Sequence, residues 1–129
     1  MSEAKTNVLL IAIDTLRADH VASHGYPRVV SPHLDRIAAE GVIFEDHFAP
    51  HIPTHPGFTT LFTGMDAFTH QRVRLGGDVL PRPEIKTLAQ LLQEAGYRTA
   101  AVDNLPEWFR QGFELYETYK WPWEMRPGA

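Results

Sequence analysis

The chain has 129 residues, the length of one ordinary domain and enough to bury a hydrophobic core. A hydrophobic share of 43%, a charged share of 22% and a formal net charge of -4 are those of a soluble globular protein and give no basic surface for nucleic acid. Because there is no cysteine, disulfides, thiolate nucleophiles and cysteine metal sites are excluded.

The first element predicted along the chain is a buried strand. Residues 7–14 read NVLLIAID, an apolar run rich in branched side chains that ends in an acid. This pattern is typical of a strand covered on both faces in a parallel sheet. The run is too short to span a bilayer and lacks a signal-peptide cleavage site. We therefore expect no membrane partner and take the cytoplasm as the default location.

Two helices are predicted from their end signals. In residues 31–41, SPHLDRIAAEG, Ser31 suits the N-cap, Pro32 the first helical position and Gly41 the stop. Residues 88–97, LAQLLQEAGY, form a second amphipathic pattern with a glycine near its end.

Two further strands are predicted, in residues 42–49 and 98–104. Strands that alternate with helices indicate the α/β class, with a mainly parallel sheet flanked by helices and with functional groups at the carboxyl ends of the strands. Asp14 and Asp103 both fall at such ends. No repeat, linker or shift in composition marks a boundary, so residues 1–129 are taken as part of a single domain.

Two segments lie outside these elements. Residues 65–85 contain two adjacent glycines and two prolines, which predicts a long loop, with room for a short hairpin. Residues 108–129 hold all three tryptophans, so this carboxyl-terminal segment is expected to pack against other surface.

Two oxygen-bearing side chains stand out as candidates for chemistry. The carboxylate of Asp14, at a predicted strand end, suits a hard cation or zinc, and the alternative is an acid that caps the next turn. Thr54 precedes a segment, residues 56–63, that can be helical. Its hydroxyl would lie where a helix start favours an anion, and the alternative is an ordinary N-cap threonine.

The seven histidines form no compact ligand motif such as H-E-x-x-H. Three of them, His51, His55 and His70, flank Thr54 in the sequence. They could contact an anionic substrate or shuttle a proton, and a purely structural role stays open for each. The histidines are His20, His24, His33, His47, His51, His55 and His70.

Several motifs in one register carry a resemblance to a known family. The stretch NVLLIAIDTLRADHVASHGYPRVVSPHLDRIAAEGVIFEDHFAP, followed by THPGFTTLFTG, AGYRTAAVDN and GFELYETY, resembles the amino-terminal part of the sulfatase family of the alkaline phosphatase superfamily. The likeness covers nearly the whole chain. It implies an alkaline phosphatase/sulfatase-like core, here incomplete.

The resemblance implies roles for individual residues. Asp14 takes the place of the family's first metal ligand, and Thr54 that of the nucleophile, which can also be a metal ligand. In sulfatases the nucleophile is a cysteine or serine converted to formylglycine within C/S-x-P-x-R. Here Pro56 matches, Phe58 replaces the arginine, and threonine excludes formylglycine. The pattern is similar to the T-x-P motif of the superfamily's phosphodiesterases and phosphonate hydrolases.

Two residues of the first turn complete this comparison. Thr15 stands where the family frequently has a second acid. Arg17 matches the arginine of the family's L-R-A-D turn, where positioning of the loop and contact with an anion are both open.

The resemblance implies a metal-dependent hydrolase of phosphate, phosphonate or sulfate esters. A divalent metal, Zn²⁺, Mn²⁺, Mg²⁺ or Ca²⁺, would activate Thr54 and neutralise charge on a small anionic ester substrate. His51, His55, His70 and Arg17 are the candidate substrate contacts.

The family's remaining metal ligands have no counterpart in these 129 residues. We therefore expect the chain to bind metal weakly and to need the remainder of a catalytic domain, or a second chain, for turnover. It would then be a fragment, a truncated product or half of a split enzyme. One alternative is a truncated, non-catalytic binding or assembly module, and another is a generic α/β domain in which Thr54 only caps a helix.

Overall fold

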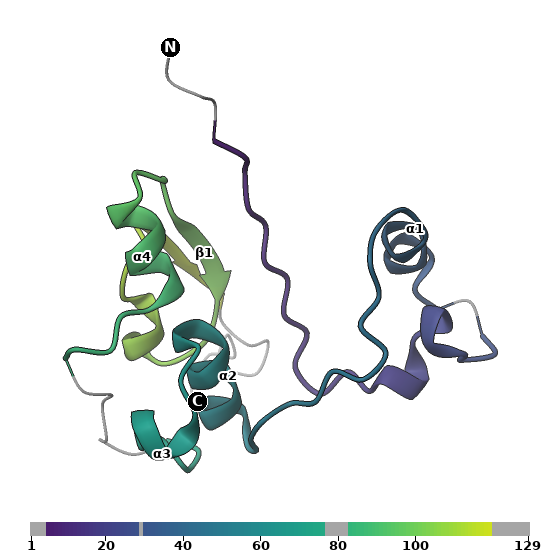
Figure 1. Ribbon diagram of the computed structural model, residues 1–129, viewed down its shortest axis with the longest axis horizontal. Helices are drawn as coiled ribbons and strands as arrows, with labels where there is room; N and C mark the ends of the chain where they lie inside the picture. Colours follow the sequence, from purple (N-terminus) through teal and green to yellow (C-terminus); the bar gives the residue numbers. More distant parts are fainter. Residues whose placement is uncertain (1–4, 29, 77–82, 120–129) are drawn as a thin grey trace, which may run out of the picture. The chain divides into compact units, whose positions relative to one another are not determined.

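The computed structural model describes residues 5–28, 30–76 and 83–119, which divide into two units, Met1–Phe48 and Ala49–Ala129 (Figure 1). From the sequence, no domain boundary is predicted within residues 1–129. The division into two units does not test whether they form one domain, so this stays a prediction.

The first unit is built around the helix α1, Pro32–Glu40, which packs against the 3-10 turn η2, Ala22–His24. Another 3-10 turn, η1, Ala18–His20, precedes it. The predicted helix is confirmed, because Pro32 occupies the first turn and Gly41 follows the last residue. The hydroxyl of Ser31 donates to the two carboxylate oxygens of Asp35 at 3.3 and 3.2 Å rather than accepting from the helix backbone.

The two strands predicted in this unit are wrong for the chain as described. No strand occurs in residues 5–28 or 30–48, and Val8, Leu9 and Ile11 are 62, 83 and 63% exposed. Phe44 is 74% exposed in the second segment. The reason is pairing: a strand of a parallel sheet needs neighbouring strands for its backbone N–H and C=O groups, and the described part of this unit supplies none.

The second unit contains three helices, a 3-10 turn and two strands among its described residues. In chain order these are α2, Thr54–Thr63; α3, Ala67–His70; α4, Leu88–Glu94; β1, Ala100–Asp103; η3, Glu107–Arg110; and β2, Leu115–Thr118.

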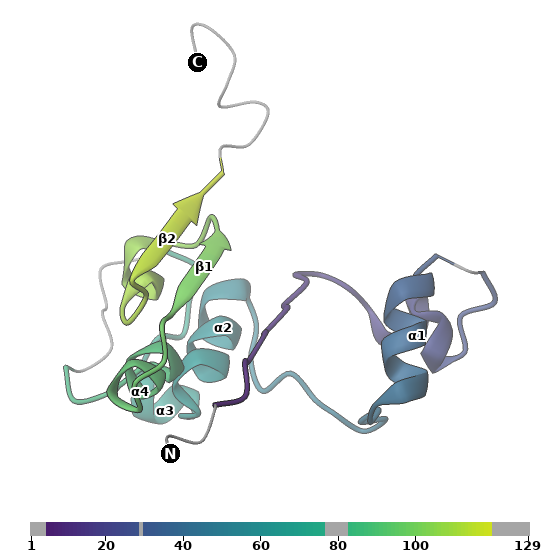
Figure 2. The same cartoon turned by 90° about the horizontal axis from the view of Figure 1, so that it is seen from above.

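The strands β1 and β2 lie side by side and parallel, with Ala100 opposite Leu115 and Asp103 opposite Thr118 (Figure 2). The predicted α/β class with a parallel sheet is thereby confirmed, in fragmentary form. The strand predicted in residues 98–104 is also confirmed, but its burial on both faces is wrong. Val102 is 76% exposed, because only two strands form the described sheet and one of its faces has no cover.

The predicted helix in residues 88–97 is α4, Leu88–Glu94, and the structure adds an amino-terminal cap that was not predicted from the sequence. The Thr87 hydroxyl accepts from the Gln90 N–H at 3.2 Å, and the Gln90 side chain accepts from the Thr87 N–H at 2.8 Å, which makes a capping box. The helix ends at Glu94, and Gly96 follows Ala95 with a positive φ of 80°.

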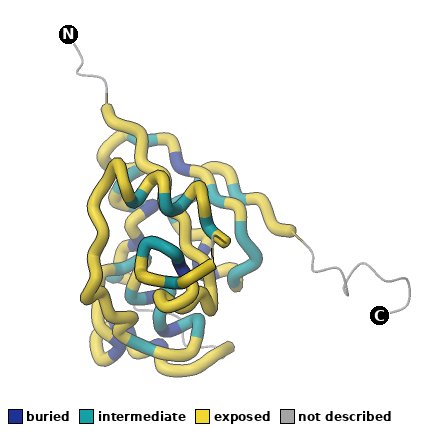
Figure 3. The backbone as a smooth tube through the Cα atoms, turned by 90° about the vertical axis from the view of Figure 1, so that its right-hand side faces the viewer, coloured by how far each residue is buried: buried dark blue, intermediate teal, exposed yellow. Residues whose placement is uncertain are grey.

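The core of the second unit forms where η3 meets α2. Figure 3 shows that buried stretches of the described backbone are short and that most of it is exposed. Phe109 is 1% and Trp108 5% exposed, and the ring centres of Phe62 and Phe109 are 5.8 Å apart. The predicted packing of the carboxyl-terminal aromatics is confirmed for these two residues, whereas residues 120–129 lie outside the described chain. The predicted loop, residues 65–85, contains the short helix α3 and otherwise no helix or strand in its described part.

No helix within the described ranges is both long enough and apolar enough to cross a bilayer.

Gly112, in the turn before β2, has no room for a side chain. Its φ is +88°, and a Cβ atom there would lie 2.3 Å from the backbone nitrogen of Gln90. We expect Gly112→Ala to lower the free energy of unfolding by about 3 kcal/mol, because left-handed strain and a backbone clash add. The control is Gly64→Ala, with a φ of +66° and no atom within 4 Å of the added Cβ, which should cost about 1 kcal/mol. Urea unfolding measures both, and equal losses would contradict the clash.

Candidate functional site

Thr54 is the first residue of α2. Pro53 holds the N-cap position without a side-chain cap, and the N–H of Gly57 donates to the Pro53 carbonyl at 3.3 Å. The alternative that Thr54 is the N-cap residue is therefore wrong. Its half-buried side chain lies at the amino end of a helix of 10 residues, where backbone N–H groups and the helix dipole favour negative charge.

Thr59, Thr63 and Gly57 show how α2 satisfies its hydroxyl groups and how closely the preceding chain approaches it. The hydroxyl of Thr59 donates to the His55 carbonyl and that of Thr63 to the Thr59 carbonyl, both at 2.7 Å, so they are satisfied within the helix. At Gly57 a Cβ atom would come within 3.1 Å of the His51 carbonyl oxygen. The absence of a side chain there lets the preceding chain pass close to the first turn of the helix.

His55, directly after Thr54, has a defined hydrogen-bonding state. Its Nδ1 accepts from the backbone N–H of Gly76 at 2.8 Å and lies 3.3 Å from Nη2 of Arg72. Partial burial lowers the pKa of His55, and the charge of Arg72 lowers it further. Both effects favour the neutral imidazole.

His70 is buried, and both of its ring nitrogens are engaged within the protein. The Arg72 backbone N–H donates to Nδ1 at 3.0 Å, so in the neutral ring Nε2 carries the proton and donates to the Thr60 hydroxyl, also at 3.0 Å. Burial lowers the pKa of His70, and the nearby His51 lowers it further. In this arrangement His70 joins α3 to α2 and has no ring nitrogen left for a substrate.

His51 and the two candidates of the first unit complete the predicted set. Nδ1 of His51 lies 2.7 Å from the carbonyl of Ile52, so it must carry a proton and donate. Asp14 lies in a turn instead of at a strand end, and its Oδ1 accepts from the N–H of Thr15 at 3.1 Å. Thr15 has a φ of 60°, rare for a β-branched residue.

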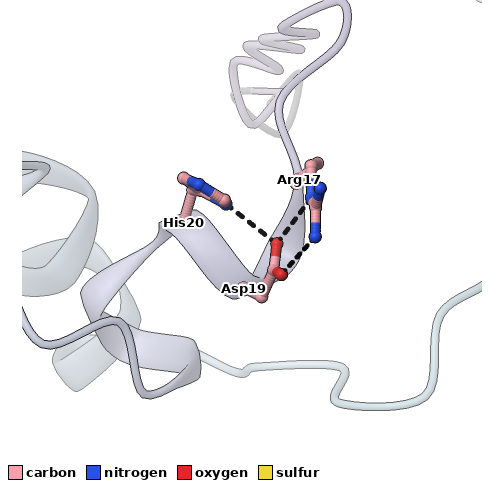
Figure 4. A network of polar contacts seen from close by, with 3 residues as sticks. All are labelled: Arg17, Asp19 and His20. Atoms are coloured by element: carbon pink, nitrogen blue, oxygen red, sulfur yellow. Dashed lines mark hydrogen bonds and ion pairs between the residues drawn. The ribbon is translucent and has the colours of Figure 1, made fainter.

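Arg17 is engaged with a carboxylate two residues away. Its Nε and Nη2 donate to Asp19 at 2.9 and 2.5 Å, and His20 lies 2.9 Å from the same carboxylate (Figure 4). The hydrogen bonds from Arg17 and then His20 lower the pKa of Asp19 to about 2. These side chains are all more than half exposed, so the network orders the turn and adds little stability.

Three of the predicted residues belong to the same unit as Thr54: His55 follows it in α2, His51 precedes the helix, and His70 contacts Thr60 of α2 at 3.0 Å. Asp14 and Arg17 belong to the other unit. Within the described ranges, no three or more His, Asp or Glu side chains come close enough to hold a metal ion. That Asp14 and Thr54 are metal ligands stays a prediction.

Two residues near the sheet and α2 were not assigned a role from the sequence. Arg72, in the predicted loop, is 4% exposed and contacts His55, and no local pattern marks it because its place depends on the folding of η3. Tyr116 donates from its hydroxyl to Asp103, which also accepts from the N–H of Leu105 at 2.8 Å. Burial and this carboxylate raise the pKa of Tyr116.

The chain is similar to known proteins over most of its length. The family model described as Sulfatase matches residues 6–123. An N-acetylgalactosamine-6-O-sulfatase of Bacteroides thetaiotaomicron is 30% identical over 101 residues, with 76% of this chain and 20% of that protein covered. Arylsulfatase A of Bos taurus is 34% identical over 98 residues, with 72% and 19% covered.

A third relative has a broader name. The "multifunctional alkaline phosphatase superfamily protein PehA" of Trinickia caryophylli is 31% identical over 104 residues, with 76% of this chain and 20% of that protein covered. The chain therefore spans about a fifth of the length of these curated relatives.

The buried His70 predicts a pH dependence of stability. Its pKa lies below the ordinary 6.5, so the unfolded chain binds its proton more readily than the folded chain does. Stability is therefore fully present above 6.5 and falls as the pH is lowered toward the folded-state value. Urea unfolding from pH ~8 to ~5 should show this loss. His70→Asn should reduce the slope without removing it, because the pKa of His55 is also lowered.

His33→Asn, at an exposed position of α1, controls for the loss of a histidine. An equal slope in wild type and His70→Asn would contradict the assignment of His70 as a buried neutral ring.

Proposed function

Because the chain belongs to the sulfatase family, we propose that it supplies the nucleophile-bearing part of a hydrolase for anionic esters, with Thr54 as the nucleophile. Family membership places it among sulfatase-like hydrolases with an alkaline phosphatase-like fold. The observation that carries the residue-level proposal is the position of Thr54. It is the first residue of α2 and not its N-cap. The nucleophile position itself comes from the resemblance to the family's motif.

The chemistry that a threonine allows narrows the substrate. Oγ1 of Thr54 attacks the phosphorus or sulfur of the ester, and the ester bond breaks with its electron pair on the leaving oxygen. The proton released by the hydroxyl passes through solvent to that oxygen, which leaves as the alcohol. Water then attacks the same phosphorus or sulfur and releases Thr54 and the free acid. A formylglycine hydrate can instead expel sulfate by collapse to the aldehyde, and threonine cannot. Phosphate and phosphonate esters are therefore preferred over sulfate esters.

One relative supports this wider range. The printed name of the Trinickia caryophylli protein is that of a multifunctional member of the alkaline phosphatase superfamily rather than of a sulfatase. The proposal keeps sulfate esters as the second substrate class, since the other named relatives are sulfatases.

The proposed reaction needs a divalent metal, and the described part of this chain offers only two of its ligands. Asp14 would contribute one carboxylate and Thr54 one oxygen, and the other ligands would come from outside the described residues. When bound, such an ion lowers the pKa of a coordinated hydroxyl and neutralises charge on the ester. Zn²⁺, Mn²⁺, Mg²⁺ and Ca²⁺ all stay open.

The contacts of the neighbouring histidines rank them as substrate ligands. His55 accepts at Nδ1 and so has an N–H at Nε2 to offer an anionic oxygen, whereas both nitrogens of His70 are engaged. His51 has its Nδ1 on a carbonyl and keeps Nε2. We assign the anion contact to His55 first. Arg17, paired with Asp19, is assigned to ordering of its turn.

A second candidate function rests on a different observation. The side chains of Leu9, Phe44 and Phe48 are 83, 74 and 80% exposed. Such apolar segments favour docking onto further protein, as in a non-catalytic assembly module. Both candidates require the remainder of a catalytic domain or a second chain as the partner, and they differ in whether hydrolysis follows.

The catalytic proposal is tested with the chain assembled with the remaining catalytic part and a divalent metal. Thr54→Ala should reduce the hydrolysis of an aryl phosphate, phosphonate or sulfate by at least about 10³-fold, because the covalent step is lost. Thr54→Ser should keep measurable turnover, and Thr63→Ala, in the last turn of α2, is the matched control. Full activity of Thr54→Ala would overturn the proposal, and an assembly without any hydrolysis would favour the second candidate.

The role of Asp14 is tested by metal binding to the same assembly. Asp14→Asn should weaken Mn²⁺ or Zn²⁺ binding by more than about tenfold in calorimetry, because a charged ligand is lost. Asp46→Asn, at an exposed position of the same unit, should leave the affinity unchanged. Equal affinities for wild type and Asp14→Asn would remove Asp14 from the metal site.

A further inference from the structure

Arg72 is a buried cation in the segment that follows α3. Its residue is 4% exposed, and its guanidinium carbon lies 5.6 Å from the ring centre of Phe109 and 6.0 Å from that of Trp108. Burial of a guanidinium is costly unless rings and hydrogen-bond acceptors surround it. The Arg72 side chain is therefore held in one place, by the rings of Phe109 and Trp108 and by His55.

Arg72 joins the segment after α3 to the helix that carries Thr54. Its side-chain Nη2 lies 3.3 Å from Nδ1 of His55, and its backbone N–H donates to Nδ1 of His70. His70 in turn contacts Thr60 at 3.0 Å. The segment is thus attached to α2 at positions 55 and 60, and the first attachment is at the residue next to Thr54.

The two groups that face Nδ1 of His55 fix the position of the ring's proton. A backbone N–H, from Gly76, and a guanidinium N–H, from Arg72, can only donate, so this nitrogen must accept. The proton of the ring is then on Nε2. His55 consequently has an N–H at Nε2 that can donate to an oxygen anion. The proton is on Nε2 because Gly76 and Arg72, both in the segment after α3, occupy Nδ1.

The motif around Thr54 lacks the arginine of the C/S-x-P-x-R pattern, and the guanidinium of Arg72 contacts the same first turn of α2. Phe58 stands where the C/S-x-P-x-R pattern has an arginine, and its ring packs near Phe62, with the ring centres 6.3 Å apart. A guanidinium nevertheless reaches the turn, from residue 72 instead of residue 58.

We propose that Arg72 is a positioning residue for the Thr54 turn, which holds His55 with its proton on Nε2 so that this N–H donates to a non-bridging oxygen of the anionic ester. The part that concerns the ester rests on the proposed function, whereas the part that concerns the ring's proton does not.

The ring's proton is tested directly by NMR on the full chain with ¹⁵N-labelled histidine at neutral pH. His55→Gln identifies the resonances of His55 by their loss. In the wild type, the ¹⁵N shifts should show an unprotonated Nδ1 and a protonated Nε2. A proton on Nδ1 in the wild type would overturn the proposal without any Arg72 variant.

Arg72→Met removes the guanidinium donors and keeps an unbranched apolar side chain in the pocket between the rings. In this variant the two shifts of His55 should move toward an average of both tautomers, because one of the two donors to Nδ1 is lost. Arg72→Lys, which keeps a donor, should retain more of the wild-type shifts. Arg74→Met, at an exposed position two residues on, is the matched control. Wild-type shifts in a folded Arg72→Met chain would overturn the proposal.

In the assembled enzyme, the ester part predicts a split between the kinetic constants. Arg72→Met should raise KM for an aryl phosphate by about tenfold with a smaller change in kcat, and Arg72→Lys should recover part of this loss. If wild type hydrolyses the ester and Arg72→Met leaves KM unchanged, the positioning role fails and the proposed function stands. If the assembly hydrolyses no ester but the NMR result holds, the proposed function fails and the assignment of Arg72 to the His55 ring stands.

Discussion

The burial of Phe109 is the contact on which the second unit depends. This side chain is 1% exposed and faces the rings of Trp108, Phe62 and His55 as well as the guanidinium of Arg72. Through these rings Phe109 packs the 3-10 turn η3 against the helix α2. Its ring also forms one apolar wall against the guanidinium of Arg72. Burial of an aromatic side chain of this size contributes about 2–3 kcal/mol, and the ring also contacts His55 in the first turn of α2, with the ring centres 6.0 Å apart.

What the sequence predicted well is what short-range chemistry determines. Helix α1 is predicted from Pro32 and Gly41, and α4 from its amphipathic pattern and Gly96, because these signals act within a few residues. The Thr87–Gln90 capping box of α4 is also local, but it was not predicted. Strands depend on partners that are distant in the chain. The apolar run at residues 7–14 has the composition of a buried strand, yet the described residues offer it no neighbour, whereas β1 forms because β2 pairs with it.

The candidate site divides in the same way. A helix beginning close to Thr54 could be predicted because its signals are local, although it was expected over residues 56–63 and α2 begins at Thr54 itself. The engagement of His70 with Thr60 and the contact from Arg72 to His55 could not, because both arise where the chain after α3 folds back onto α2. Likewise, the pairing of Arg17 with Asp19 depends on the 3-10 turn η1 and not on residue type alone.

The exposed run at residues 8–13, VLLIAI, has a consequence for the handling of the chain in the cell and in the test tube. It has no charge, no proline and no glycine, is rich in β-branched and leucine side chains, and Val8, Leu9 and Ile11 are more than half exposed. Segments of this composition pair between copies into intermolecular sheets. As long as no neighbouring strand pairs with it, this run favours aggregation of the chain. The yield of soluble chain should therefore rise when a strand that pairs with the run is present.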